Sequence, residues 1–247
     1  MKGGSSRFFP VSTIAIEAFR REYTTLPGQW QALAPGVDAT RFAAPDRTDC
    51  RADIRGRYGI GASDILLLFV GMNFEVKGLG TIIKALAQAR RARPEANLRL
   101  LVVGRGDEGK YRKMAQLLGI AEVVIFAGTQ IDGLERYYRA ADIFIMLSKF
   151  DTFGMVVLEA MAAGLPVIVS PNVGAKDLVE EAVNGYVLPE HQDVDAAADR
   201  IVQLSNTEQR KAMGGEAAQT AVMHSWEMLA EKIGKIYELK FQSKAVS

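Results

Sequence analysis

The sequence alternates short apolar runs with longer segments of helical periodicity. Residues 65–70 (Ile-Leu-Leu-Leu-Phe-Val) are apolar throughout, and a helical pattern begins soon afterwards, near Leu79. Strands without a polar face must be covered on both sides, which is typical of a parallel sheet between two layers of helices. The expected strands are 65–70, 98–103, 123–127, 143–147, 167–170 and 185–188, and the expected helices begin at 79 and span 108–118, 133–141, 153–163, 176–182, 193–204, 207–222 and 226–240.

This alternation predicts one doubly wound α/β domain over residues 36–240, with right-handed crossovers. Residues 1–35 are too few and too irregular for a domain, although 12–30 contain a pattern for a short helix or two; residues 1–6 have the composition of a cloning remnant. Ligands of such sheets bind outside the carboxyl ends of the strands. The chemistry is therefore expected in the loops at Gly71, Gly104, Gly128, Ser148 and Pro171.

Charge and cysteine content exclude several functions. Lys and Arg number 30 against 29 Asp and Glu, so the chain lacks the overall positive charge of a nucleic-acid-binding protein. The cluster Arg90, Arg91 and Arg93 is most simply the solvated end of a helix, with weak contact to an anionic membrane surface as the alternative. The single Cys50 excludes an internal disulfide and a multi-cysteine zinc site, and favours a reducing, cytoplasmic compartment. No apolar run is long enough for a signal peptide or a membrane span.

One carboxylate interrupts an otherwise apolar helix. Between Gly154 and Pro166, Glu159 is the only residue that is neither apolar nor small and neutral. A carboxylate in such surroundings is costly unless something donates a hydrogen bond to it. We expect that partner to be a ligand.

A lysine stands at the start of another helix on the same expected sheet edge. Lys77 precedes the helix that begins near Leu79, where a cation opposes the helix dipole. A lone lysine there is usually a solvated surface residue. Gly78 and Gly80 let a ligand approach the backbone, however, and an anion shared by Lys77 and the helix N-terminus would remove the conflict.

The loop after the second strand contains a Gly-x-Gly-x-x-Gly pattern at residues 104–109. A dinucleotide site also needs an acidic residue about 20 positions later, at the end of the next strand. That strand ends Ile-Phe-Ala-Gly-Thr, without an acid. We therefore interpret the loop as a tight turn and a helix start, and an NAD-dependent oxidoreductase is a distant alternative.

The loop before the helix at 153–163 has three parts. Asp151 or Thr152 is expected to cap the helix, and Phe153, Gly154 and Met155 offer backbone N–H groups to a phosphate. Asp151 and Glu159, eight residues apart, could hold two ends of one ligand. A plain N-cap is the competing role for Asp151.

With these residues assembled, the chain resembles the C-terminal, donor-binding half of the retaining GT-B glycosyltransferases of group 1. It is most similar to the branch with lipopolysaccharide-core glucosyltransferases and many bacterial hexosyl- and mannosyltransferases. The resemblance rests on Pro-Gly-Val-Asp at 35–38 with Phe42, Phe-Val-Gly at 69–71 with Lys77-Gly78, Val103-Gly104, Ala-Asp-Ile at 141–143, the segment 151–167 with its acidic-x7-Glu motif, Asn184-Gly185, and Ser-Trp-Glu at 225–227.

The resemblance implies a Rossmann-like domain, one half of a GT-B fold, and a role for each loop. Glu159 would bind the ribose hydroxyls of the nucleotide, and Asp151 the hydroxyls of the donor sugar. The loop residues expected at the donor are Gly71, Asn73 and Lys77 after the first strand, Thr129, Gln130 and Ile131 at the base, and Phe153, Gly154, Met155 and Val156 at the diphosphate.

The same resemblance implies hexosyl transfer with retention, catalysed by Lys77 and Asp151 without a metal or other cofactor, by front-face attack assisted by the leaving phosphate. UDP-glucose is the first donor expected and GDP-mannose the second. The sequence departs from the family pattern in two ways: Asp151 stands where glutamate is more common, and residues 72–76 lack the arginine that often precedes the lysine. Leaving-group stabilisation then depends more heavily on Lys77.

Such enzymes also have an N-terminal domain that binds the acceptor, here a glycan or glycolipid. Residues 1–35 would be the tail of that domain and a linker, and residues 225–240 the helix that crosses back to it, with an apolar face available for self-association. Two alternatives remain open: a GT-B sugar-nucleotide epimerase, and a nucleotide-binding module that is inactive on its own.

Overall fold

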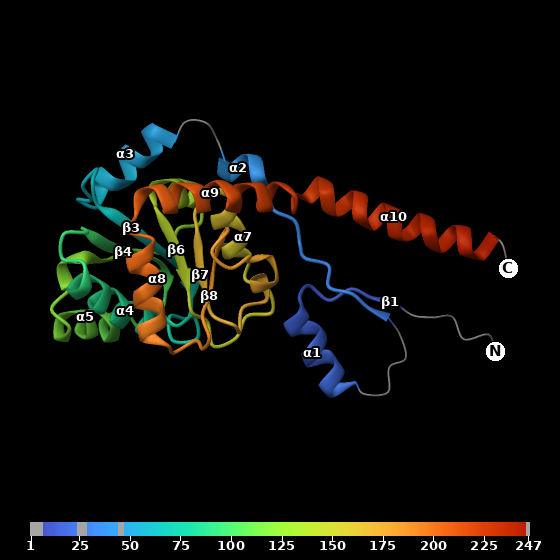
Figure 1. Ribbon diagram of the computed structural model, residues 1–247, viewed down its shortest axis with the longest axis horizontal. Coiled ribbons are helices and arrows are strands. Elements are labelled where there is room, and N and C mark those ends of the chain that lie inside the picture. Colours follow the sequence, from blue (N-terminus) through green and yellow to red (C-terminus); the bar gives the residue numbers. More distant parts are fainter. Residues whose placement is uncertain (1–6, 24–28, 44–46, 246–247) are drawn as a thin grey trace.

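The computed structural model describes residues 7–23, 29–43 and 47–245. Its centre is a six-stranded parallel sheet in the order β5-β4-β3-β6-β7-β8 (Figure 1). The strands are β3 (Ile65–Met72), β4 (Leu98–Arg105), β5 (Val124–Gly128), β6 (Ile143–Met146), β7 (Val167–Val169) and β8 (Gly185–Val187). The chain moves outward from β3 to β5 and then returns to β6 on the other side of β3, so the order reverses between β3 and β6. This is the doubly wound topology that the alternating pattern predicts.

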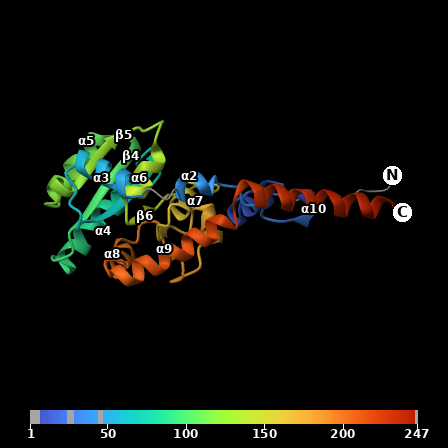
Figure 2. The ribbon, with the colours of Figure 1, turned by 90° about the horizontal axis from the view of Figure 1, so that it is seen from above.

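Helices cover both faces of the sheet (Figure 2). Leu67 and Phe69 pack with α4 (Leu79–Ala92), α5 (Glu108–Leu117) and α8 (Val194–Gln203) on one face. Leu66 and Leu68 pack with α2 (Ala39–Ala43), α3 (Arg47–Arg57), α6 (Leu134–Ala140), α7 (Met155–Ala162) and α9 (Thr207–Val222) on the other. All four β3 side chains are fully buried, because alternate residues of a strand point to opposite faces and both faces are covered.

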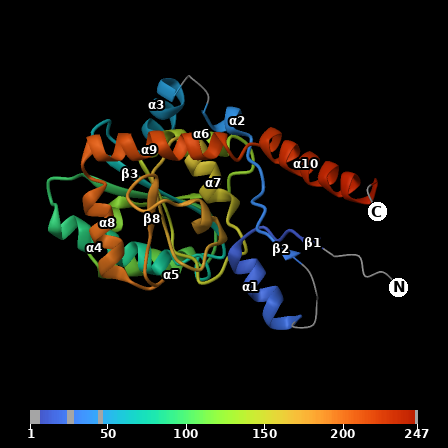
Figure 3. The same ribbon diagram turned by 45° about the vertical axis from the view of Figure 1, so that its right-hand side comes forward.

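The segment before the sheet domain lies beside the last helix of the chain, α10 (Figures 1 and 3). This segment holds β1 (Arg7–Phe8), α1 (Thr13–Glu22) and β2 (Gln29–Trp30), and α10 (Trp226–Ala245) extends away from the sheet next to it. Ser12 caps α1, and its hydroxyl also donates a hydrogen bond of 2.5 Å to the carbonyl of Thr152. The backbone N–H of Thr13 donates to Asp177 Oδ2 at 2.7 Å. The segment therefore contacts the loop that precedes α7.

Two expected helices differ in the structure. The helix expected at 176–182 is a 3₁₀ turn, η2 (Gly174–Leu178), and a second such turn, η1 (Ala121–Val123), precedes β5. Asn184 explains the first difference, because its side chain accepts from the N–H of Glu180 and donates to the carbonyl of Leu178 in place of helical partners. The helix expected at 153–163 begins only at Met155, since Gly154 has the left-handed φ of 87°.

Candidate functional site

A cavity of about 460 Å³ opens at the carboxyl edge of the sheet. It lies between the ends of β3 and β4, the loop after β5, and the N-terminus of α7. It brings together nine of the residues predicted from the sequence: Gly71, Lys77, Thr129, Gln130, Asp151, Phe153, Gly154, Met155 and Val156. A cavity thus lies at the edge of the sheet where the sequence predicts a ligand.

Close backbone contacts build the floor of this cavity. Gly71 and Gly104 pair across β3 and β4, and a Cβ atom on Gly104 would lie 1.9 Å from the carbonyl oxygen of Gly71. Gly104 also has a φ of 130°, which side chains rarely tolerate. Beyond it, Asp107 caps α5 by accepting from the N–H of Lys110 at 3.0 Å. The Gly-x-Gly-x-x-Gly pattern is therefore a tight turn and a helix start, as expected.

Lys77 and Asp151 form an ion pair within the cavity. Lys77 Nζ lies 2.5 Å from Asp151 Oδ2, and the two side chains are only 21% and 17% exposed. The sequence predicts both residues in the site but assigns them to separate ligand groups, the diphosphate and the sugar. Each of these charged side chains therefore satisfies the charge of the other.

The N-terminus of α7 offers three backbone N–H groups to the cavity. Gly154 is the N-cap and contributes no side-chain hydrogen bond, so the expectation that Asp151 or Thr152 caps the helix is wrong. Asp151 Oδ1 instead accepts from the N–H of Phe153 at 3.2 Å, which means that this amide is already paired. In the described part of the chain, the amides of Gly154, Met155 and Val156 meet no acceptor. They point outward from the positive end of the helix dipole, which favours an anion.

The carboxylate of Glu159 has a protein partner, whereas the sequence prediction is that its partner is a ligand. The hydroxyl of Tyr138 donates to Glu159 Oε2 at 2.8 Å. Burial raises the pKa of Glu159, while the Tyr138 hydrogen bond and the charge of Arg41 act in the opposite direction. Glu159 is only partly buried and does not line the cavity, but it follows Met155 by one helical turn on the same face of α7.

Asn73 and Ile131 also lie outside the cavity lining. Asn73 has a φ of 64° and accepts from the N–H of Val76, so its side chain stabilises the turn after β3. Ile131 is 84% exposed, whereas its neighbour Gln130 lines the cavity and donates to the carbonyl of Ala127 at 2.7 Å. Of the expected base-contacting loop, Thr129 and Gln130 face the cavity.

Sequence reasoning missed several lining residues: Val70, Met72, Val103, Leu134 and Thr152. Three of them, Val70, Met72 and Val103, adjoin Gly71 and Gly104 near the ends of β3 and β4, and this position is the signal that could have identified them. They add apolar surface, which suits a ligand with an uncharged part beside its phosphates.

Three further expectations concern the rest of the surface. Within residues 7–23, 29–43 and 47–245, no group of three or more His, Cys, Asp or Glu could hold a metal ion. None of the helices that the structure describes is both long and apolar enough to span a bilayer. Arg90 donates to the carbonyl of Leu98 at 2.7 Å and Arg93 pairs with Glu95, which favours the solvated helix end for this cluster.

Comparisons with known proteins agree with this geometry. The family model described as "Glycosyl transferases group 1" matches residues 51–221. D-inositol 3-phosphate glycosyltransferase of Rhodococcus jostii (strain RHA1) is 30% identical over 243 residues, which cover 95% of this chain and 53% of the relative. The chain thus spans about half the length of the curated relatives that it matches.

Solved structures show the same similarity. WaaG, a glycosyltransferase involved in lipopolysaccharide biosynthesis, superposes with a TM-score of 0.79 at 28% identity, covering 95% of this chain and 63% of WaaG. Anabaena HepE shares the fold with a TM-score of 0.78 at 21% identity, over 93% and 62% of the two chains. The matched region is the C-terminal, Rossmann-like half of a GT-B fold. The chain therefore belongs to the group 1 glycosyltransferase family.

Proposed function

We propose that this chain is the donor-binding domain of a retaining hexosyltransferase and that it binds a nucleotide-diphosphate sugar. The observation that supports this most directly is the convergence of Lys77 with the amides of Gly154, Met155 and Val156 in one cavity. Breaking the bond between sugar and phosphate develops negative charge on the diphosphate. Hydrogen-bond donors that are already oriented toward the diphosphate stabilise this charge without reorganisation and without a metal ion.

Three other parts of the site would bind the sugar, the base and the ribose of the donor. Asp151 would bind hydroxyls of the sugar, and the residues Thr129 and Gln130 would meet the base. Glu159 Oε1 has no hydrogen-bond partner among the described residues, so it is free to accept from the ribose hydroxyls while Oε2 keeps the Tyr138 bond. The nucleoside would then extend from the cavity along the partly buried face of α7 that carries Met155 and Glu159.

UDP-glucose is the donor that we propose first. The solved HepE structure contains UDP and glucose, and the WaaG structure is of a lipopolysaccharide enzyme, which make UDP-hexoses the most informative probes. GDP-mannose is the second candidate. We further propose that the complete enzyme transfers the hexose with retention to a glycan or glycolipid held by another domain, in the cytoplasm.

Calorimetric titration with UDP, UDP-glucose, GDP and GDP-mannose tests donor binding directly. We expect UDP and UDP-glucose to bind more tightly than the guanine nucleotides. Lys77→Ala and Glu159→Ala should each weaken UDP binding by about tenfold or more, because each removes a charged hydrogen-bonding group.

Lys84→Ala is the matched control, since Lys84 is exposed on α4 and does not line this cavity. It should change the dissociation constant by less than about twofold. Absence of binding to all four nucleotides at millimolar concentration would overturn the proposal. Unchanged affinity in both site variants, with a native circular dichroism spectrum, would show that the site is assigned to the wrong residues.

We also propose self-association through α10. Trp226, Ile233 and Tyr237 are 51%, 37% and 61% exposed on this helix. Their apolar surface would be covered either by a second copy or by the domain that carries the acceptor. Light scattering over a range of concentrations distinguishes a monomer from a dimer.

A further inference from the structure

A second, larger cavity lies at the end of the sheet opposite the donor cavity, the one that contains Lys77 and Asp151. Its volume is about 610 Å³. Asp142 directly precedes β6, Gly164 lies between α7 and β7, and the other walls come from α3 and α9. These are the amino ends of the strands, so the cavity is separate from the donor site. Its lining residues are Arg51, Ala141, Asp142, Gly164, Arg210, Lys211, Gly214, Gly215 and Ala218.

The lining carries three cationic side chains and one carboxylate, and that carboxylate is already paired. Asp142 Oδ1 accepts from Arg51 at 2.7 Å, and Oδ2 accepts from Arg55 at 2.6 Å and from the N–H of Leu66 at 2.8 Å. Both oxygens are therefore neutralised by the two arginines on α3. The positive charges on the α9 side of the cavity have no counterpart in this lining.

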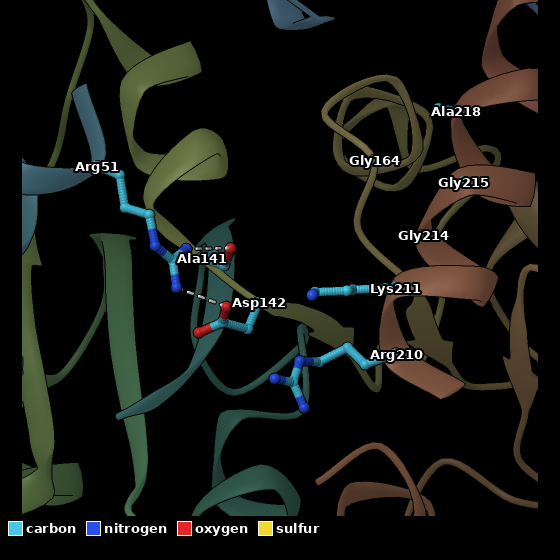
Figure 4. A pocket seen from close by; sticks show the side chains of 9 residues that line it. All are labelled: Arg51, Ala141, Asp142, Gly164, Arg210, Lys211, Gly214, Gly215 and Ala218. Carbon is cyan, nitrogen blue, oxygen red and sulfur yellow. Dashed lines mark hydrogen bonds and ion pairs between the residues drawn. The ribbon is translucent and has the colours of Figure 1, made fainter. Parts of the chain in front are cut away.

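Arg210 and Lys211 reach from α9 toward Asp142 across the cavity (Figure 4). Arg210 Nη1 donates to the carbonyls of Leu204 and Ser205. Among the described residues its Nε has no acceptor, and its Nη2 has only Thr207 Oγ1 at 3.4 Å. Lys211 Nζ meets no acceptor in the part of the chain that the structure describes. At least three N–H groups are thus available to a bound anion.

The surroundings of Arg210 would make a nearby anion favourable. Burial lowers the pKa of its guanidinium, Asp142 raises it, and the charge of Arg51 lowers it. An anion between the two arginines would offset both of the lowering effects.

We propose that this cavity binds a small soluble phosphate monoester, with its phosphate among Arg51, Arg210 and Lys211. A phosphate matches the several convergent N–H donors, and arginine suits it because two of its N–H groups can bind two oxygens at once. None of the nine lining side chains is aromatic, so a nucleobase would find no stacking surface. Glycine and alanine line the rest, leaving space for a compact hydrophilic body such as a sugar; a Cβ atom on Gly215 would meet nothing within 4 Å.

NMR titration of the ¹⁵N-labelled chain with glucose 6-phosphate, at constant ionic strength, tests this site. We expect saturable shifts at the amides of Gly164, Gly214 and Gly215. Lys211→Glu should weaken this binding by about tenfold or more, because it replaces a donor with a repelling charge. Lys211 is exposed and holds no other group of the described chain, so this variant keeps the fold.

The matched control is Lys113→Glu, the same charge change at an exposed position of α5, which should alter affinity by less than about twofold. Arg210→Gln provides a second variant, and it should also weaken binding, with its fold checked by the spectrum itself. The proposal is overturned if glucose without the phosphate produces the same shifts. It is equally overturned if the shifts do not saturate, occur only at Gly154 in the donor cavity, or are the same in Lys211→Glu as in the unmodified chain.

Discussion

Replacing Asp151 by asparagine tests whether the Lys77–Asp151 ion pair competes with the donor. The variant removes the negative charge that holds Lys77 Nζ at 2.5 Å. Asparagine keeps an oxygen that can accept from the N–H of Phe153, so the loop retains its 3.2 Å hydrogen bond. The perturbation is therefore confined to the charge.

The magnitude follows from the geometry of the pair. Two unit charges 2.5 Å apart attract by about 7 kcal/mol at an effective dielectric constant of about 20, most of which is offset by desolvation. For two side chains that are mostly but not fully buried, a net coupling of about 1.5 kcal/mol is reasonable, the lower end for a charged hydrogen bond. Since about 1.4 kcal/mol is a factor of ten, UDP should bind about tenfold more tightly to Asp151→Asn.

Calorimetry with UDP and with UDP-glucose measures this effect and separates the two roles of Asp151. UDP has no sugar and gains the full benefit of a free Lys77, whereas UDP-glucose also loses a sugar contact and should gain less. Glu75→Gln is the control, because Glu75 pairs with Lys149 and Lys110 at the same edge of the sheet but outside the cavity lining. If UDP affinity is unchanged or falls in Asp151→Asn, the pair does not oppose donor binding and this reasoning is refuted.

Three other substitutions test the site and the fold. Burial raises the pKa of Glu159 above 4.5, so the contribution of this group to folding stability is present at low pH and is lost as the pH rises through the raised pKa. Glu159→Gln should keep the Tyr138 contact and should reduce the fall in melting temperature between about pH 4 and about pH 7. Gly104→Ala should destabilise the fold by about 2–4 kcal/mol in urea unfolding, given its φ of 130° and the Gly71 carbonyl, and a loss below about 1 kcal/mol would contradict the close contact. Arg55→Leu leaves the carboxylate of Asp142 without its most buried partner and should lower the free energy of unfolding by about 3–5 kcal/mol in the same measurement. An unchanged free energy of unfolding would show that Arg51 alone is enough to hold Asp142.

The strands were predictable because burial on both faces requires continuous apolar runs. The ends of β3 and β4 were not, since the ladder continues through Gly71↔Gly104 and Met72↔Arg105. Glycine has no side chain to signal a strand, but its backbone pairs as well as any other. The sequence pattern therefore stops where the hydrophobic run stops, two residues before the hydrogen bonds do.

The helix expected at 176–182 shows the opposite error. Its apolar spacing suits a helix, yet Asn184 binds the backbone at Glu180 and Leu178, and Ala182 takes a φ of 63°. A side chain that supplies hydrogen bonds to the backbone competes directly with helical ones. This competition depends on where the following turn places the side chain of Asn184. The spacing of apolar residues carries no information about that position.

The candidate site likewise has features that the local sequence predicts and contacts that it does not. Glycines, loop amides and the lysine before a helix are local features, and the sequence predicts them together at one sheet edge. The Lys77–Asp151 pair joins residues 74 positions apart, and the Tyr138–Glu159 bond joins two helices. Only the folded topology reveals that these side chains already satisfy one another.

The contact between Ser12 and Thr152 couples the segment before the sheet domain to the loop that precedes α7. The Ser12 hydroxyl holds the carbonyl of Thr152, and a Cβ atom on Gly174 would collide with the same serine at 2.7 Å. The hydrogen bond from Ser12 thus ties residues 7–23 to the loop between Asp151 and Gly154, while Thr13 holds the same segment to Asp177. The position of the Thr152 carbonyl, and with it the loop beside the cavity, therefore depends on where residues 7–23 lie.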